Sequence, residues 1–131
     1  MNMIKFLLSA LLVLFVSIGF AQTQDLTDRW VFIATTNSGE DAYFDSQTKT
    51  NSSAWVKFVT PVEKYKELKR KLTIEKYFYN CKNRTLAIGT GRFVTLSGET
   101  KEIASDNTVT YEEVIPDTFG ELALNAICSF K

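Results

Sequence analysis

Cys81 and Cys128 are the most reactive side chains in a sequence that has no histidine. An oxidising compartment favours a disulfide between them, and two buried free thiols or a shared metal ion are the alternatives. Zinc fits poorly, because no histidine and no further cysteine exist to complete its ligand set. A disulfide would close a loop of nearly fifty residues, which stabilises a domain by about 4 kcal/mol in the chain-entropy model.

The missing histidine also narrows the reactions that the chain could catalyse. Histidine is the commonest general base and the usual partner of a serine or cysteine nucleophile. Carboxylate pairs can act without it, as in glycosidases, and the candidates are Glu112 with Glu113 and Asp41 with Asp45. Neighbouring glutamates on a strand point to opposite faces, and the two aspartates flank a turn, so solvated surface is the better interpretation. We therefore expect no enzymatic activity.

The run Gly89-Thr90-Gly91 begins like a dinucleotide-binding fingerprint. Its third glycine position is Val94, however, and no helix is predicted to follow. A bulge or bend in a strand explains these glycines better. We expect neither a cofactor nor a metal ion.

Cations cluster between Glu63 and Lys71, which is the one local charge asymmetry in the sequence. One interpretation is a docking patch for acidic glycans, nucleic acid or a protein partner, steered by charge and weakened by salt. An aromatic residue among the cations supports docking, because aromatics are enriched at interfaces. The other interpretation, which we favour, is a solvated loop that keeps a sheet edge soluble. The candidate partner-binding residues are Lys64, Tyr65, Lys66, Lys69, Arg70 and Lys71.

The N-terminal residues 1–21 have the pattern of a cleaved secretory signal peptide. Lys5 precedes an apolar run that ends in Gly19-Phe20-Ala21, with small residues at both positions expected before a cleavage site. The run is too short for a confident membrane-spanning helix, which needs roughly 20 apolar residues. An uncleaved anchor is the alternative, but no positive cluster or stop-transfer pattern follows. We predict cleavage after Ala21.

Residues 22–131 then form one domain, a length that suits a single hydrophobic core. The whole chain has 15 Lys plus Arg against 15 Asp plus Glu, and the signal removes only Lys5. A near-neutral charge gives no electrostatic case for binding nucleic acid.

Alternating apolar and polar residues predict about six strands, bounded by turn residues. Trp30 and Trp55 lie in two of them, where core packing is expected rather than ligand stacking. The charged segment from Glu63 to Lys71 fits a loop or an exposed turn of helix. The predicted strands are 29–34, 42–45, 54–60, 73–81, the pieces 85–88 and 92–96, and 108–115.

The end of the chain changes to a helical period. Thr118 and Glu121 form a capping box after Pro116. Cys128 would point away from the centre of the apolar stripe, so a bridge to Cys81 predicts that the helix ends or loosens just before it. The elements together predict an α+β fold, an antiparallel sheet with one C-terminal helix packed on a face. The predicted buried stripe is Phe119, Leu122, Ala123, Ala126 and Ile127.

Several segments in this order resemble the surface-adhesin protein E family of bacterial exported proteins, over nearly all of residues 22–131. The resemblance implies a small antiparallel sheet with a C-terminal helix, a bond between Cys81 and Cys128, no catalytic activity, and adhesion to host matrix or plasma glycoproteins. No cysteine lies near the cleavage point for lipid attachment, and the basic loop matches no host-binding motif. The segments are Arg29-Trp30-Val31-Phe32-Ile33, Tyr43-Phe44-Asp45, Ala54-Trp55-Val56-Lys57-Phe58, Tyr79-Asn80-Cys81-Lys82-Asn83-Arg84-Thr85, and Pro116 through Cys128.

Together these features predict an exported, non-enzymatic binding domain, periplasmic or at the surface of a Gram-negative-type bacterium. The expected partner is a protein, either a host glycoprotein or a bacterial envelope protein, and the sequence is compatible with a homodimer. No nucleic acid and no transmembrane span after signal cleavage are expected. The alternative function is a periplasmic structural or accessory protein, and an enzyme working through carboxylates is the third class.

Overall fold

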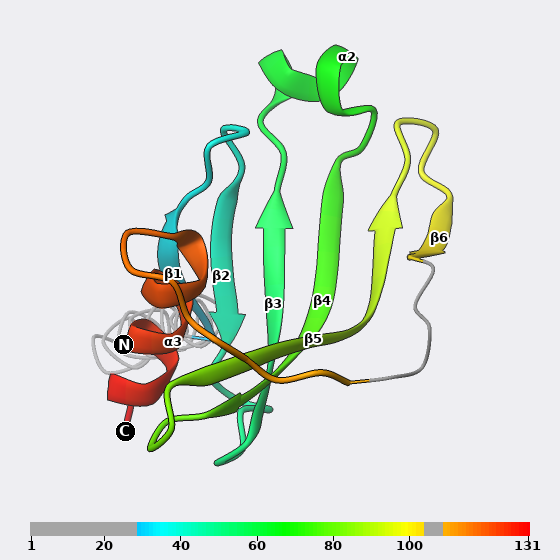
Figure 1. Cartoon of the computed structure of the whole chain (residues 1–131). Coiled ribbons are helices and arrows are strands. Elements are labelled where there is room, and N and C mark those ends of the chain that lie inside the picture. The colour runs from blue at the N-terminus through cyan, green and yellow to red at the C-terminus, as the bar shows by residue number, and fades with distance from the viewer. Residues whose placement is uncertain (1–28, 104–108) are drawn as a thin grey trace, which may run out of the picture.

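The computed structural model describes residues 29–103 and 109–131 of the chain (Figure 1). The predicted signal peptide, residues 1–21, lies outside these ranges, and so does the predicted start of the mature domain at residue 22. Within the two ranges, no helix is both long enough and apolar enough to cross a membrane.

The described strands form one antiparallel sheet in which, from β1 to β6, chain neighbours are also spatial neighbours. The spatial order is β1-β2-β3-β4-β5-β6, and β7 pairs with β5. Such a meander needs only short turns between its strands, in keeping with the turn residues that separate the apolar segments. The strands are β1 (Trp30–Thr35), β2 (Asp41–Asp45), β3 (Ser53–Val59), β4 (Leu72–Asn80), β5 (Thr85–Val94), β6 (Thr100–Ile103) and β7 (Glu112–Glu113).

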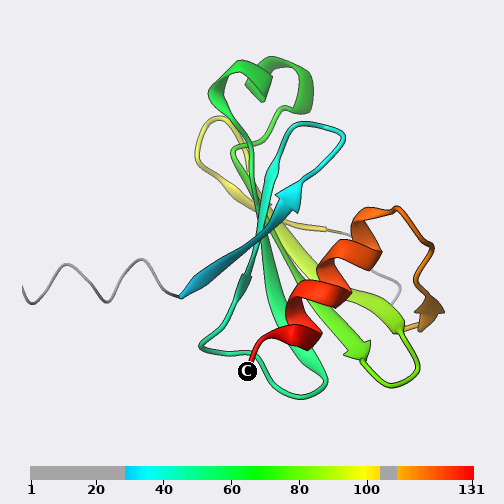
Figure 2. The same cartoon turned by 90° about the vertical axis from the view of Figure 1, so that its left-hand side faces the viewer.

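Two helical segments interrupt the meander between β3 and β4, and a longer helix follows the sheet. A 3-10 turn, η1 (Val62–Lys64), and a single helical turn, α2 (Tyr65–Leu68), have no buried residue, as an exposed turn of helix requires. The helix α3 (Phe119–Ser129) lies across one face of the sheet, at the end remote from α2 (Figure 2). The predicted α+β fold with one C-terminal helix on a face is confirmed.

The glycine run predicted as a bulge or bend lies within one continuous strand, β5, rather than between two strands. Glu75 pairs with Gly91 and Tyr77 with Ile88, so the register of β4 and β5 shifts between them. A Cβ on Gly89 would lie 2.6 Å from the ring of Phe78, which explains why no larger residue fits there.

The last predicted strand, 108–115, is largely wrong, and β6 was not predicted. In the described part of that segment, 109–115, only Glu112–Glu113 is a strand, and residue 108 lies outside the described ranges. The strand β6 has the sequence Thr-Lys-Glu-Ile, and its first three residues are exposed. An edge strand of this kind buries too little apolar surface to show the alternation that marked the others.

The core lies between α3 and the sheet face formed by alternate residues of β2, β3 and β4. Leu124 and Ile127 of the helix are fully buried against Phe44 and Val56. Burying aliphatic and aromatic side chains of this size contributes about 1.5 to 3 kcal/mol each. The buried cluster is Phe44, Ala54, Val56, Tyr77, Tyr79, Ala123, Leu124 and Ile127.

The helix buries a different side from the predicted stripe. The prediction that the helix ends or loosens before Cys128 is therefore wrong. Leu122, expected inside, is 49% exposed, whereas Leu124 is fully buried. Residues four apart lie on the same side of a helix, so burying Leu124 also turns Cys128 toward the sheet. The helix therefore continues through Cys128 to Ser129 and needs no loosening before the bridge.

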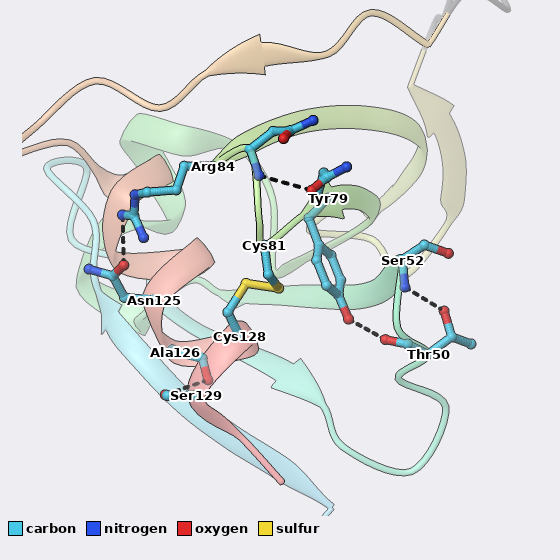
Figure 3. The surroundings of a disulfide bond; sticks show 11 residues. Thr50, Ser52, Tyr79, Cys81, Arg84, Asn125, Ala126, Cys128 and Ser129 are labelled. Carbon is cyan, nitrogen blue, oxygen red and sulfur yellow. Dashed lines mark hydrogen bonds between the residues drawn. A yellow bond between two sulfur atoms is a disulfide. The ribbon is translucent and has the colours of Figure 1, made fainter.

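A disulfide joins Cys81, directly after β4, to Cys128 in α3 (Figure 3). The two Cα atoms are 5.8 Å apart, a usual distance for a disulfide. Arg84 Nη2 donates a hydrogen bond of 2.8 Å to Asn125 Oδ1, a second link between the β4–β5 turn and the helix. On the far side of the bridge, the Tyr79 hydroxyl donates to the backbone oxygen of Thr50. The predicted disulfide is confirmed, and neither cysteine is free.

Candidate partner-binding surfaces

The six residues predicted to bind a partner lie in one excursion of the chain between β3 and β4. Figure 1 shows this excursion at the end of the sheet that carries α2, remote from α3. Lys69 ends α2 in the left-handed conformation, with φ of 56°. Backbone hydrogen bonds from Thr60 to Lys71 (3.1 Å) and from Lys71 to Val94 (2.8 Å) fasten its base to the sheet.

The cations of this loop are not equivalent. Lys64 Nζ lies 3.2 Å from Glu67 Oε2, and Arg70 is drawn away from the surface into a contact with Glu40. Lys66, Lys69 and Lys71 are the exposed members, whereas Tyr65 is partly buried. The surface that a partner could contact is therefore smaller than the sequence suggested.

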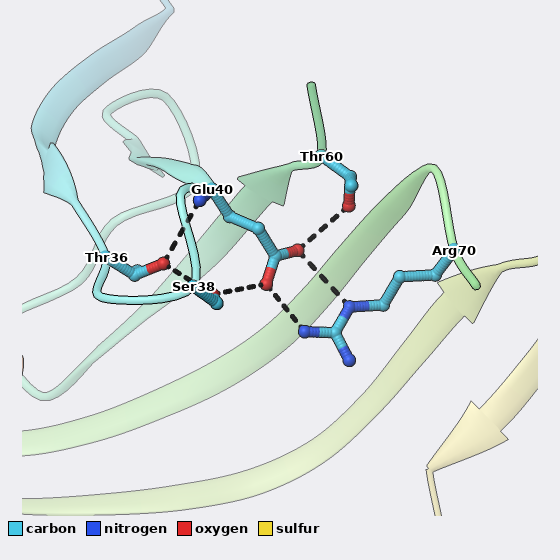
Figure 4. Close-up of polar contacts among 5 residues, drawn as sticks. All are labelled: Thr36, Ser38, Glu40, Thr60 and Arg70. Atoms are coloured by element: carbon cyan, nitrogen blue, oxygen red, sulfur yellow. Dashed lines mark hydrogen bonds and ion pairs between the residues drawn. The ribbon is translucent and has the colours of Figure 1, made fainter. Parts of the chain in front are cut away.

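Arg70 binds the buried carboxylate of Glu40 and is therefore not a free surface cation (Figure 4). Its guanidinium donates to both oxygens of Glu40, at 2.6 and 3.2 Å, and Glu40 is only 3% exposed. Thr60 and Ser38 complete the site with hydrogen bonds of 2.9 and 3.1 Å. Burial alone raises the pKa of Glu40, but the hydrogen bonds from Arg70, Thr60 and Ser38 outweigh it and leave the pKa below its ordinary value.

A second buried carboxylate, Asp45, has a similar arginine partner. Arg29 donates to its two oxygens at 2.9 and 2.8 Å, and Thr48 adds a hydrogen bond of 2.6 Å. The hydrogen bonds from Arg29 are the largest influence and, against the opposing effect of burial, lower the pKa of Asp45 to about 2. Asp45 is therefore an ionised anchor for the residues around it.

The carboxylate pairs considered for catalysis do not converge. Asp41 and Asp45 stand four residues apart on β2, about 13 Å along an extended strand, and Asp41 accepts a separate hydrogen bond from Thr35. Glu112 and Glu113 are both exposed on β7. Neither pair brackets a common point where a substrate bond could lie.

Trp30 and Trp55, expected in the core, lie instead on the sheet face opposite α3. Successive side chains of a strand point to opposite faces, and Val56 next to Trp55 is fully buried under the helix. Val31, next to Trp30, also packs against the core. Both tryptophans are only partly buried, and neither belongs to the buried cluster. We call this second face the open face.

Lysines lie over the aromatic rings of the open face. Lys57 Nζ is 4.1 Å from the ring centre of Trp30 and 5.4 Å from that of Tyr43, and Lys76 Nζ is 4.9 Å from the ring centre of Trp55. Such cation–π contacts contribute about 0.5 to 1 kcal/mol at exposed sites. Burial lowers the pKa of Lys57, and the positive charge of Arg29 lowers it further.

One row of paired residues crosses strands β1 to β6 on the open face and combines aromatic, apolar and charged groups. The row borders a groove of about 890 Å³, whose walls include Trp30, Trp55 and Ile74. The sequence contained the signal for this surface, because Trp55 and Lys57 alternate with the buried Val56. The row is Phe32, Tyr43, Lys57, Ile74, Arg92 and Glu102.

The geometry defines a disulfide-bonded sheet-and-helix domain with two candidate surfaces, the exposed lysines of the β3–β4 loop and the open face. Comparisons of the chain with protein-family models, with curated proteins and with solved structures found no match. The resemblance to surface-adhesin protein E therefore rests on the sequence segments quoted above.

Proposed function

We propose that this chain is an exported, non-enzymatic binding domain of the surface-adhesin protein E type, which binds an acidic region of a host matrix or plasma glycoprotein. The observation that carries the proposal is the array of lysines over aromatic rings on the open face. Aromatic residues supply large contact areas at interfaces, and cations matched to a partner's acidic groups steer its approach.

Exposure of apolar side chains on the same face supports a docking role. Phe32 is 53% exposed although its ring packs edge-on against Tyr43, with 5.6 Å between ring centres. A soluble domain normally covers a contiguous apolar surface, and such surfaces rimmed by polar groups mark interaction sites. Lys57 and Lys76 have no carboxylate within salt-bridge distance in the described part of the chain, so their charges are available to a partner.

A pair of variants with equal charge tests the open face. Lys57→Gln with Lys76→Gln removes the two lysines over the rings, and Lys82→Gln with Lys101→Gln removes two exposed lysines elsewhere. With immobilised plasma and matrix glycoproteins as probes, we expect the first pair to weaken binding by about tenfold or more. Equal losses in both pairs would mean that only net charge matters and would contradict the assignment of this face.

The loop lysines are tested separately. Lys66→Glu, Lys69→Glu and Lys71→Glu reverse the exposed charges and spare Arg70, whose contact with Glu40 holds the fold together. If the loop steers a partner, the association rate falls and its dependence on salt weakens. An unchanged rate removes the loop from the binding surface.

The alternative, a periplasmic accessory protein with a bacterial partner, differs in where the protein resides. Protease is added to intact cells of the source and to osmotically opened cells. Degradation on intact cells supports the adhesin function, whereas protection until the cells are opened contradicts it and favours a bacterial partner.

A further inference from the structure

A second pocket lies on the α3 side of the sheet and shares Ile103 of β6 with the groove of the open face. It has a volume of about 590 Å³, and its apolar walls are Phe58, Leu68, Phe93 and Ile103. Phe58 also packs against Phe119 of α3, with 5.4 Å between ring centres, which places the pocket beside the helix start. Pockets of roughly 300 to 1,000 Å³ are typical of small-molecule sites.

Two polar residues of β4 line this pocket and have unused hydrogen-bonding capacity. Thr73 is 7% exposed, and its hydroxyl is buried without a hydrogen-bond partner. Most buried polar groups are paired, so such a group calls for an explanation. Glu75 stands two residues further along the strand, and its side chain therefore points to the same face, about 7 Å away.

Glu75 is the less expected of the two, because its carboxylate has no hydrogen bond or ion pair with any described residue. Glu40, on the same pocket, receives hydrogen bonds from Arg70, Thr60 and Ser38. Burial raises the pKa of Glu75, the charge of Arg70 opposes this effect, and the charge of Glu40 makes a smaller contribution that raises the pKa further. The fold thus keeps a carboxylate in a place where its charge costs stability.

The charges around the pocket favour a cation at Glu75. Arg70 is matched by Glu40 through two hydrogen bonds. Lys69 also lines the pocket and is an exposed residue. Lys69 and Glu75 are the two of these four side chains without an ion pair to a described residue, and Glu75 is the less exposed of the two.

We propose that this pocket binds a small primary amine with an apolar body, whose ammonium group donates to the Glu75 carboxylate and the Thr73 hydroxyl. An ammonium group has three donors and no acceptor, which suits two neighbouring acceptors. The phenylalanine, leucine and isoleucine walls enclose the apolar body. This site is distinct from the open face and does not depend on the proposed adhesin function.

Three probes that share a phenylethyl group and differ in charge test the site. Phenethylamine carries the ammonium group, 2-phenylethanol is its neutral counterpart, and 3-phenylpropionate is an anion. Amide resonances of the disulfide-bonded mature protein are followed by NMR as each probe is added. We expect phenethylamine to shift resonances of Thr73, Glu75 and Leu68 in a saturable way, at least about tenfold more tightly than 2-phenylethanol.

Conservative variants separate recognition from a mere crevice. Glu75→Gln keeps the side-chain shape and removes a partly buried charge, so it is expected to fold, and a dispersed NMR spectrum verifies this. Its preference for phenethylamine over 2-phenylethanol should disappear, whereas Glu113→Gln on the exposed strand β7 should keep it. Equal binding of all three probes, binding unaffected by Glu75→Gln, or no saturable shifts at all would overturn the proposal and leave ordered water as the partner of these groups.

Discussion

The guanidinium of Arg70 and the carboxylate of Glu40, thirty residues apart in the chain, form a two-pronged contact with a shortest distance of 2.6 Å. Glu40 belongs to the β1–β2 turn and Arg70 to the β3–β4 loop, so the contact ties two neighbouring turns of the sheet together (Figure 4). An arginine that looked like part of a docking patch is thus a structural residue.

Removing this arginine should destabilise the domain. Arg70→Ala leaves the Glu40 carboxylate buried without its cation, and we expect a loss of about 2 to 3 kcal/mol, less than for a fully buried pair because Arg70 is 35% exposed. Lys66→Ala on α2 is the matched control and should stay within about 0.5 kcal/mol. Urea unfolding followed by circular dichroism measures the stability of both variants. If Arg70→Ala were as stable as Lys66→Ala, the structural role of Arg70 would be contradicted.

Acid should weaken the fold through Asp45. Its pKa is about 2 in the folded protein against an ordinary value of 3.8, so the unfolded chain binds a proton more readily. The stabilisation is fully present above about pH 4 and is lost as the pH falls toward 2. Asp45→Asn should lower stability at pH 7 and flatten this part of the pH profile. A variant whose profile between pH 4 and 2 matches the parent protein would rule out Asp45 as the source.

Glu75 should have the opposite effect. Burial raises its pKa above the ordinary value of 4.5, so its stabilising contribution is complete below that pH and is lost as the pH rises through the folded-state pKa. Glu75→Gln should therefore raise Tm at pH 7 and leave it nearly unchanged at pH 4. Differential scanning calorimetry at both values checks this, and a Tm that falls at pH 7 would show that the charge is stabilised by a contact in the folded state.

Loss of the disulfide should cost a large part of the stability. The bond closes a loop with a sequence separation of 47 residues, and small domains typically lose about 2 to 5 kcal/mol when such a bond is removed. Cys81→Ser with Cys128→Ser should lower the free energy of unfolding by that amount, and a reducing agent should do the same to the parent protein. If Leu124 and Ile127 alone held α3 in place, both treatments would leave stability unchanged.

Local patterns in the sequence determined most elements of this fold, with β6 and the segment 109–115 as exceptions. The alternation around Val56 predicted β3, and Thr118 three residues before Glu121 predicted the helix start, where the Thr118 hydroxyl accepts from the Glu121 amide. The presence of two cysteines, with no histidine and no further cysteine in the sequence, predicted the disulfide. These features could be predicted because neighbours a few residues apart set backbone conformation and the periodicity of exposed surface.

Only the tertiary structure decided how these elements face one another. Either face of β3 could have received the helix, and burial of Val56 rather than Trp55 created the open face. Rotation of α3 onto Leu124 placed Cys128 at the sheet, and the contact of Arg70 with Glu40 removed a cation from the predicted patch. Contacts between residues this far apart in sequence depend on which surfaces pack most completely and which buried charges find a partner. A local sequence pattern does not specify either of these outcomes.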